Sequence, residues 1–105
     1  MAAFVITYLE VTDPQAFQAY REAARPTFAL YGGKPIVVDG AFEVLEGMVQ
    51  PKSVVVVEFE SMEHARRWYA SPEYAKTIPV RQQAANASLI LVDGVAPSHR
   101  SGPTR

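Results

Sequence analysis

Three stretches of the chain consist mainly of aliphatic, β-branched and aromatic residues, as β-strands do. They cover residues 4–11, 53–59 and 88–92. In the first two stretches both alternating faces are apolar, which is typical of central strands that are covered on both sides. The pattern therefore predicts two central strands, but it does not indicate which face of each strand meets the helices.

Two shorter apolar runs, residues 35–38 and 42–45, are separated by Asp39-Gly40. Glycine supplies the positive φ angle that a tight hairpin turn or a β-bulge needs. The two runs are therefore predicted to form either a hairpin or one long strand with a bulge.

The first helix is predicted to begin at Asp13, which can cap free backbone N–H groups, and Pro14, which has no N–H to lose. Apolar residues follow at helical spacing: Phe17, Tyr20, Ala24, Phe28 and Tyr31. Pro26 lies inside this pattern and predicts a kink or break at the preceding residue. Gly32-Gly33 is expected to end the helix.

A second helix is predicted after Ser61, a capping residue, with Trp68 on its apolar side. Ser71-Pro72 repeats the combination of a cap and a proline. It predicts a further short helix, which is expected to break at Pro79.

The predicted order of elements is β-α-β-β-α-β, with extra short helices before the last strand. The simplest architecture for this order is a ferredoxin-like α+β sandwich, in which the helices cover one face of an antiparallel sheet. The other face is left open, and an open apolar face of this size usually marks an interface. We therefore expect a homodimer in which two sheets pack face to face as a dimeric α/β barrel. The single domain is expected to span residues 1–96, followed by a flexible C-terminal tail at 97–105.

The composition limits the functions that this fold could have. A chain of 105 residues suffices for one domain, and a net charge of −1 argues against nucleic acid as a partner, because phosphate binding needs a concentrated basic surface. Cysteine is absent, which excludes disulfides and thiolate chemistry. No apolar run is long enough to span a membrane and the first residues form no basic leader, so a cytoplasmic protein without membrane contact is expected.

Several short motifs occur in an order and at spacings that resemble those of a known family. They are Thr12-Asp13-Pro14, Tyr20-Arg21, Tyr31-Gly32-Gly33, Leu45-Glu46-Gly47, Val57-Glu58-Phe59, Trp68-Tyr69, Ser71-Pro72-Glu73-Tyr74 and Arg81. Over about residues 4–95 the chain resembles the family catalogued as domain of unknown function 1330. The resemblance implies a ferredoxin-like fold of the dimeric α/β-barrel superfamily, which also contains cofactor-free monooxygenases and haem-degrading proteins. It implies no particular reaction, because the family has no established activity.

Two charged residues are candidates for chemistry. Glu58 interrupts a run of valines on a predicted central strand, where an ionised group is costly unless it is paired. It is a candidate catalytic base with a pKa raised by burial, or alternatively a structural carboxylate near the end of its strand. The planar guanidinium of Arg81 could bind a substrate carboxylate, or it could form a structural ion pair with Glu58 or another acid.

Tyr20, Tyr69 and Tyr74 are candidates to line a substrate pocket between the helices and the sheet, where their phenol groups could position a small ligand. Alternatively they only pack in the core, as we expect of Phe17 and Trp68. No spacing of histidines and acidic residues indicates a metal site, and no phosphate-binding loop or nucleophile motif is present. Neither a metal nor a cofactor is therefore expected.

These observations lead to two hypotheses about function. The first is a homodimer that binds or transforms a small organic molecule, an anion if Arg81 holds it, in a pocket within each subunit and without a cofactor. The alternative is a non-catalytic dimer whose polar residues, including Glu58 and Arg81, serve only in assembly.

Overall fold

A computed structural model describes residues 2–48 and 51–95 of the chain. Its elements in chain order are β1 (Ala3–Val11), α1 (Pro14–Leu30), β2 (Lys34–Val38), β3 (Ser53–Phe59), α2 (Met62–Ala70), α3 (Pro72–Ala75), α4 (Ile78–Ala84) and β4 (Ala85–Asp93). The predicted tail at 97–105 and the predicted domain end at 96 lie outside the described residues. Within residues 2–48 and 51–95, no helix has the length and apolar character needed to cross a membrane.

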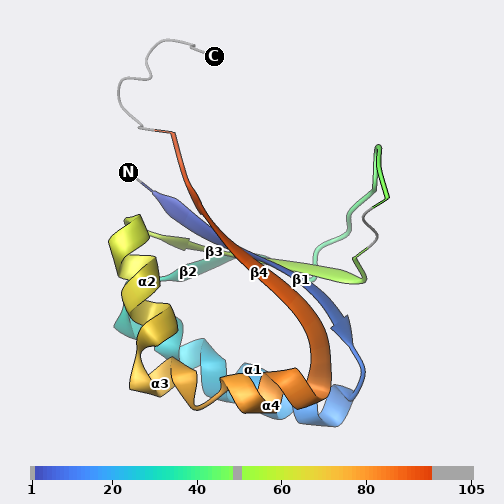
Figure 1. The fold of residues 1–105 in the computed structure, drawn as a ribbon, viewed down its shortest axis with the longest axis horizontal. Coiled ribbons are helices and arrows are strands. Elements are labelled where there is room, and N and C mark those ends of the chain that lie inside the picture. Colours follow the sequence, from blue (N-terminus) through green and yellow to red (C-terminus); the bar gives the residue numbers. More distant parts are fainter. Residues whose placement is uncertain (1, 49–50, 96–105) are drawn as a thin grey trace.

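The four strands form one antiparallel sheet in the order β2-β3-β1-β4, with β1 and β3 in the centre. The helices lie on one side of this sheet (Figure 1). The predicted ferredoxin-like α+β sandwich is thereby confirmed, and the extra short helices are α3 and α4, which precede the last strand.

The structure shows which face of the central strands the helices cover. Val5 of β1 and its partner Val57 of β3 are 6% and 2% exposed and pack in the core. The next positions along these strands, Ile6 and its partner Val56, point to the opposite face. Ile90 of β4, which pairs with Ile6, is 47% exposed. One face of the sheet is therefore covered by helices, and the other is open and apolar.

The ends of α1 form as the sequence predicts. The side chain of Asp13 accepts a hydrogen bond from a backbone N–H of the first turn at 3.1 Å, and Pro14 occupies the first helical position. At the other end Gly32 has a φ angle of 79°, and the N–H of Gly33 donates to the carbonyl of Phe28 at 2.7 Å. This is the usual way in which a glycine pair closes a helix.

Of the predicted kink or break near Arg25, the break is wrong, because α1 continues through Pro26 to Leu30. Ala24 and Thr27, on either side of Pro26, are 2% and 4% exposed. The hydroxyl of Thr27 also donates to the carbonyl of Ala24 at 2.6 Å. These buried contacts hold the helix together where the proline removes a backbone hydrogen bond.

The predicted pairing of the runs at 35–38 and 42–45 is wrong, both as a hairpin and as one long strand. The first run forms β2, with a register shift in its middle, but residues 42–45 form no strand. Asp39, with a φ angle of 55°, donates its N–H to the carbonyl of Val54 at 3.1 Å. The chain has then reached the start of its partner strand β3. Residues 42–45 have nothing left to pair with, and this segment extends away from the sheet (Figure 1).

The first two helices after β3, α2 and α3, begin at the predicted capping residues, Ser61 and Ser71. The predicted break at Pro79 is wrong, because α3 already ends at Ala75 and Pro79 lies in the first turn of α4. A proline fits there because the first N–H groups of a helix have no partner within it. The strand that follows, β4, is longer than the predicted run at 88–92.

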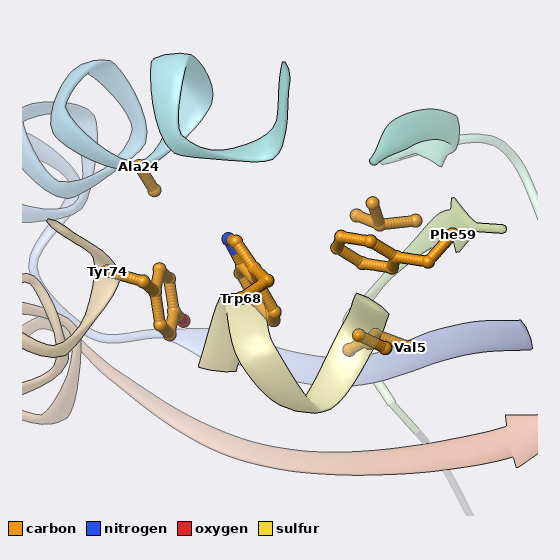
Figure 2. Packing of buried hydrophobic residues seen from close by; sticks show 7 residues of the cluster. Val5, Ala24, Phe59, Trp68 and Tyr74 are labelled. Carbon is orange, nitrogen blue, oxygen red and sulfur yellow. The ribbon is translucent and has the colours of Figure 1, made fainter. Parts of the chain in front are cut away.

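The main core lies between the sheet and the helices and is centred on Trp68, which is 2% exposed (Figure 2). Its ring packs against Tyr74 at a centroid distance of 4.1 Å and against Phe59 at 5.4 Å. The indole N–H donates to the hydroxyl of Thr27 at 2.9 Å, so the polar atom of this ring is satisfied inside the core. Gly33 permits the packing at one edge, because a Cβ there would lie 2.6 Å from the ring of Phe59.

Candidate functional site

A cavity of about 80 Å³ lies within the single chain, between the sheet and α1. Strands β1 and β3 line its floor, and Trp68 and Tyr74 line one wall. Arg25 of α1 and Val38 of β2 also line it, and both are exposed. The cavity therefore opens to solvent between α1 and the edge strand β2.

Three polar side chains form a hydrogen-bonded chain in the cavity wall. Arg81 donates from Nη1 to the hydroxyl of Tyr74 at 2.9 Å, and this hydroxyl lies 2.7 Å from the hydroxyl of Tyr20. Tyr74 and Arg81 are 0% and 6% exposed, so the hydrogen bond between them is shielded from water. One phenolic proton is used between the two tyrosines, which leaves the other for a further acceptor.

The local structure of three helices places these side chains. Tyr20 belongs to the apolar stripe of α1. Ser71 accepts a hydrogen bond from the N–H of Tyr74 at 3.1 Å, so the cap of α3 fixes that residue at the start of the helix. The hydroxyl of Thr77 donates to the carbonyl of Tyr74 at 2.7 Å, and the backbone carbonyl of Thr77 accepts from the backbone N–H of Arg81 at 3.1 Å. The turn between α3 and α4 thus holds Tyr74 and Arg81 together.

Arg81 is a buried cation, and it forms no ion pair within the part of the chain that the structure describes. Its guanidinium stays protonated at any ordinary pH, and its burial is costly unless an anion or hydrogen bonds compensate. The hydroxyl of Tyr74 supplies one hydrogen bond, but Nε of Arg81 is buried without a hydrogen-bond partner among the described residues. An oxygen anion in the cavity would compensate the charge of the guanidinium.

The hydroxyls of Tyr20 and Tyr74 are hydrogen-bond donors that lie next to the charged guanidinium of Arg81. Burial raises the pKa of Tyr20, so its phenol remains protonated at neutral pH. A cation next to protonated phenols is an arrangement that stabilises an oxygen anion, either a carboxylate or an enolate.

The structure brings together Tyr20, Tyr74 and Arg81 from the candidates of the sequence, but it leaves Tyr69 outside the cavity. Tyr69 is 45% exposed on α2. Its ring packs against that of Tyr74 at a centroid distance of 5.8 Å. It therefore supports the wall of the cavity without lining it.

The predicted pairing of Glu58 with Arg81 is wrong. In β3, Val57 and Phe59 are buried in the core, and Glu58 between them points to the open face of the sheet, opposite Phe4 in the register. Arg81 lies on the helix side. The alternation in β3 shows which residues share a face, but it could not show which face the helices cover.

Two further arginines on α1, Arg21 and Arg25, line the cavity and were missed by the sequence reasoning. Arg21 follows Phe17 by four residues and Arg25 precedes Phe28 by three, so both extend the apolar stripe of the helix. This helical spacing could have shown from the sequence that both arginines lie on the side of α1 that faces the cavity. Arg21 donates to the carboxylate of Asp39 at 2.8 Å, and its guanidinium lies 5.1 Å from the ring centroid of Phe17.

No group of three or more histidine or acidic side chains that could hold a metal ion occurs within residues 2–48 and 51–95. His64 has local partners instead. Its Nδ1 lies 2.7 Å from the hydroxyl of Ser61, and its Nε2 lies 3.4 Å from the carboxylate of Glu60.

A family model described as "Domain of unknown function (DUF1330)" matches residues 2–95. No curated protein gives a significant match to the sequence. Among solved structures, a protein of unknown function from Rhodopseudomonas palustris has 22% sequence identity and a TM-score of 0.72, and the alignment covers 91% of this chain and 84% of that one.

Two more distant structures have the same fold. SnoaB from Streptomyces nogalater, a cofactor-independent oxygenase, has 14% identity and a TM-score of 0.65, with 92% of this chain and 96% of that chain covered. A dimeric protein of unknown function and ferredoxin-like fold from Bacteroides fragilis has 7% identity and a TM-score of 0.52, with 89% and 96% covered. At these identities the likeness establishes the fold and no activity.

Proposed function

Because the chain belongs to the DUF1330 family, whose description names no reaction, we propose a function from the cavity itself: the protein binds a small organic anion between its sheet and its helices. The observation that carries the proposal is Arg81, a buried cation with an unpaired Nε–H and no acidic partner among the described residues. A purely structural arginine would be expected to meet a carboxylate of its own chain.

The remaining lining indicates the body of the ligand. Most of the side chains around the cavity are apolar, and the rings of Phe17, Phe28 and Trp68 are among them. Apolar walls with a few converging polar groups are typical of sites that bind small organic molecules. The ligand that fits is therefore a small carboxylic acid with a hydrocarbon body, whose carboxylate lies at Arg81 and Tyr20.

The proposal also includes assembly of the chain as a homodimer through the open face of the sheet. Besides Ile6 and Val56, this face carries Ile90 and Val92, which are 47% and 40% exposed in the single chain. A continuous aliphatic surface of this kind is typical of an interface. The Bacteroides fragilis protein, which has the same fold, is described as dimeric.

Glu58 then has a role in assembly rather than in chemistry. It lies on the open face and pairs in the register with Lys34 of β2, an oppositely charged neighbour. In the proposed dimer this pair of residues contributes to the contact between subunits, as the alternative hypothesis from the sequence assumed for Glu58.

The binding proposal is tested by titrating the protein with hexanoate and with hexanamide, its uncharged counterpart of equal length. Trp68 is the only tryptophan of the chain and lies in the cavity wall, so its fluorescence reports occupancy. We expect hexanoate to bind about ten-fold or more tightly than hexanamide, because a hydrogen bond to a charged group is worth more than one to a neutral group. Native mass spectrometry on the same samples gives the oligomeric state.

The matched variants are Arg81→Gln and Arg67→Gln. Arg81→Gln should abolish the preference for hexanoate. Arg67→Gln should leave it unchanged, because Arg67 is exposed and paired with Glu63 on α2. If wild-type protein binds neither compound, or binds both equally, the binding proposal is wrong and the non-catalytic dimer is favoured. This comparison of two ligands on wild-type protein holds even if Arg81→Gln does not fold.

A further inference from the structure

The charges around the cavity are distributed unevenly. The described residues that line it include three arginines, Arg21, Arg25 and Arg81, and neither an aspartate nor a glutamate. The chain as a whole has 10 basic and 11 acidic residues, so this segregation does not reflect its composition. Arg21 is paired with Asp39, but Arg25 and Arg81 form no ion pair among the described residues, and two such cations favour a ligand with more than one negative charge.

The arginines lie at two depths of the cavity. Arg81, on α4, is 6% exposed and belongs to the buried part of the wall. Arg21 binds Asp39, the residue that follows the edge strand β2, beside which the cavity opens to solvent. Arg25 lies one helical turn after Arg21, at the mouth of the cavity.

The two arginines at the mouth differ in their ion pairing. Arg21 is held in place by the 2.8 Å contact with Asp39, whose φ angle of 55° fixes an uncommon conformation for a residue with a side chain. Arg25 is exposed and forms no ion pair within the described residues. Arg25 is therefore the cation that is available to a ligand that reaches the mouth.

From this arrangement we infer that the ligand is a dicarboxylate, with one carboxylate at Arg81 and the second at the mouth, at Arg25 with support from Arg21. The inference rests on the proposed function, because it adds a second anionic group to the ligand of the same cavity. The apolar walls between the two ends receive the hydrocarbon part of the ligand. Arg25 is thus a residue that determines specificity, and the second carboxylate determines the orientation of the ligand.

The test compares hexanoate with adipate, which has the same six carbons and a carboxylate at each end. We expect adipate to bind wild-type protein about five-fold more tightly, which corresponds to a partly exposed ion pair. In Arg25→Gln, adipate should lose this advantage while hexanoate binds as in wild type. Arg67→Gln, which removes an exposed arginine outside the cavity, should leave the affinities for both acids unchanged.

The outcomes separate this inference from the proposed function. If hexanoate binds but adipate binds no more tightly, or if Arg25→Gln weakens both acids equally, the dicarboxylate inference is wrong and the binding proposal stands. If neither acid binds to wild-type protein, the proposed function itself is wrong. Succinate and butyrate, a shorter matched pair, test whether the two ends are too far apart for a four-carbon chain, in which case succinate shows no advantage.

Discussion

The two faces of the sheet have similar strand residues but very different surroundings. On the covered face, Val5 and Val57 meet a layer of aromatic rings in which buried polar atoms such as the indole N–H of Trp68 find partners. Ile6 and Val56 point to the open face, which no other layer of the described residues covers (Figure 1). The same alternation of valines and isoleucines therefore builds a core on one side and an unpartnered surface on the other.

The difference indicates how each face is used. The covered face contains Arg81 and Tyr20, polar groups that an apolar core alone does not need. Such groups support the proposed ligand, because their burial is costly until something compensates for it. The open face has aliphatic residues at its centre, among them Ile90, and these support the proposed packing against a second copy of the chain.

Replacement of Trp68 by alanine tests the covered face and is expected to have the largest effect. The side chain is 2% exposed and packs against four rings, so its loss leaves a large cavity and removes the hydrogen bond to Thr27. We expect the free energy of unfolding to fall by about 3–5 kcal/mol. It is measured by urea unfolding with far-UV circular dichroism at fixed protein concentration.

The control for this variant is Tyr69→Ala on the same helix. Tyr69 is also aromatic, but it is 45% exposed. Its loss should cost about 1 kcal/mol or less, as is usual for a largely exposed side chain. Equal losses in the two variants would contradict a core centred on Trp68.

Replacement of Ile90 by lysine tests the open face. In a symmetric dimer the substitution introduces a charge on both subunits, and we expect the dimer to weaken about 100-fold or more because a buried unpaired charge costs several kcal/mol. Analytical ultracentrifugation over a range of concentrations measures the change, and far-UV circular dichroism should remain that of the folded chain. Leu30→Lys is the control, since Leu30 is 64% exposed on α1, on the helix side. A wild-type protein that is monomeric throughout would contradict the assignment of this face.

The elements that depend on local sequence were predictable. Caps such as Asp13 and Ser71 act on their own first turn, and the valines of β3 favour an extended strand wherever it pairs. The order of these elements then leaves few possible topologies, which is why the ferredoxin-like arrangement followed from the sequence.

The features that depend on distant contacts were not predictable. Pro26 does not break α1 because Thr27 and Ala24 are buried against the rest of the protein. The run at 42–45 is no strand because β2 already pairs with β3 as far as the start of β3, which leaves residues 42–45 no part of that strand to pair with. The side on which Glu58 lies depends on which face the helices cover, and both faces of β3 are apolar enough for either choice.

The smallest predicted effect concerns Tyr31→Phe, which probes the helical layer above the cavity. Tyr31, at the end of α1, donates to the carboxylate of Glu73 in the first turn of α3 at 2.8 Å. This hydrogen bond lowers the pKa of Glu73 below its ordinary value of 4.5. A lowered pKa in the folded state means that the pair stabilises the fold fully above about pH 4.5 and loses its contribution as the pH falls further. Urea unfolding at pH 7 and pH 3 should therefore show a difference between wild type and Tyr31→Phe that is larger at pH 7.

Glu73→Gln is the matched control, because glutamine retains an acceptor for the hydroxyl of Tyr31 but does not titrate. In the Glu73→Gln background, Tyr31→Phe should have the same effect at both pH values. A difference that stays constant with pH in the wild-type background would mean that the hydroxyl of Tyr31 stabilises the junction of α1 and α3 without acting on the charge of Glu73. The pH dependence thus distinguishes a hydrogen bond from Tyr31 to the ionised carboxylate of Glu73 from a contribution of the Tyr31 hydroxyl that does not depend on that charge.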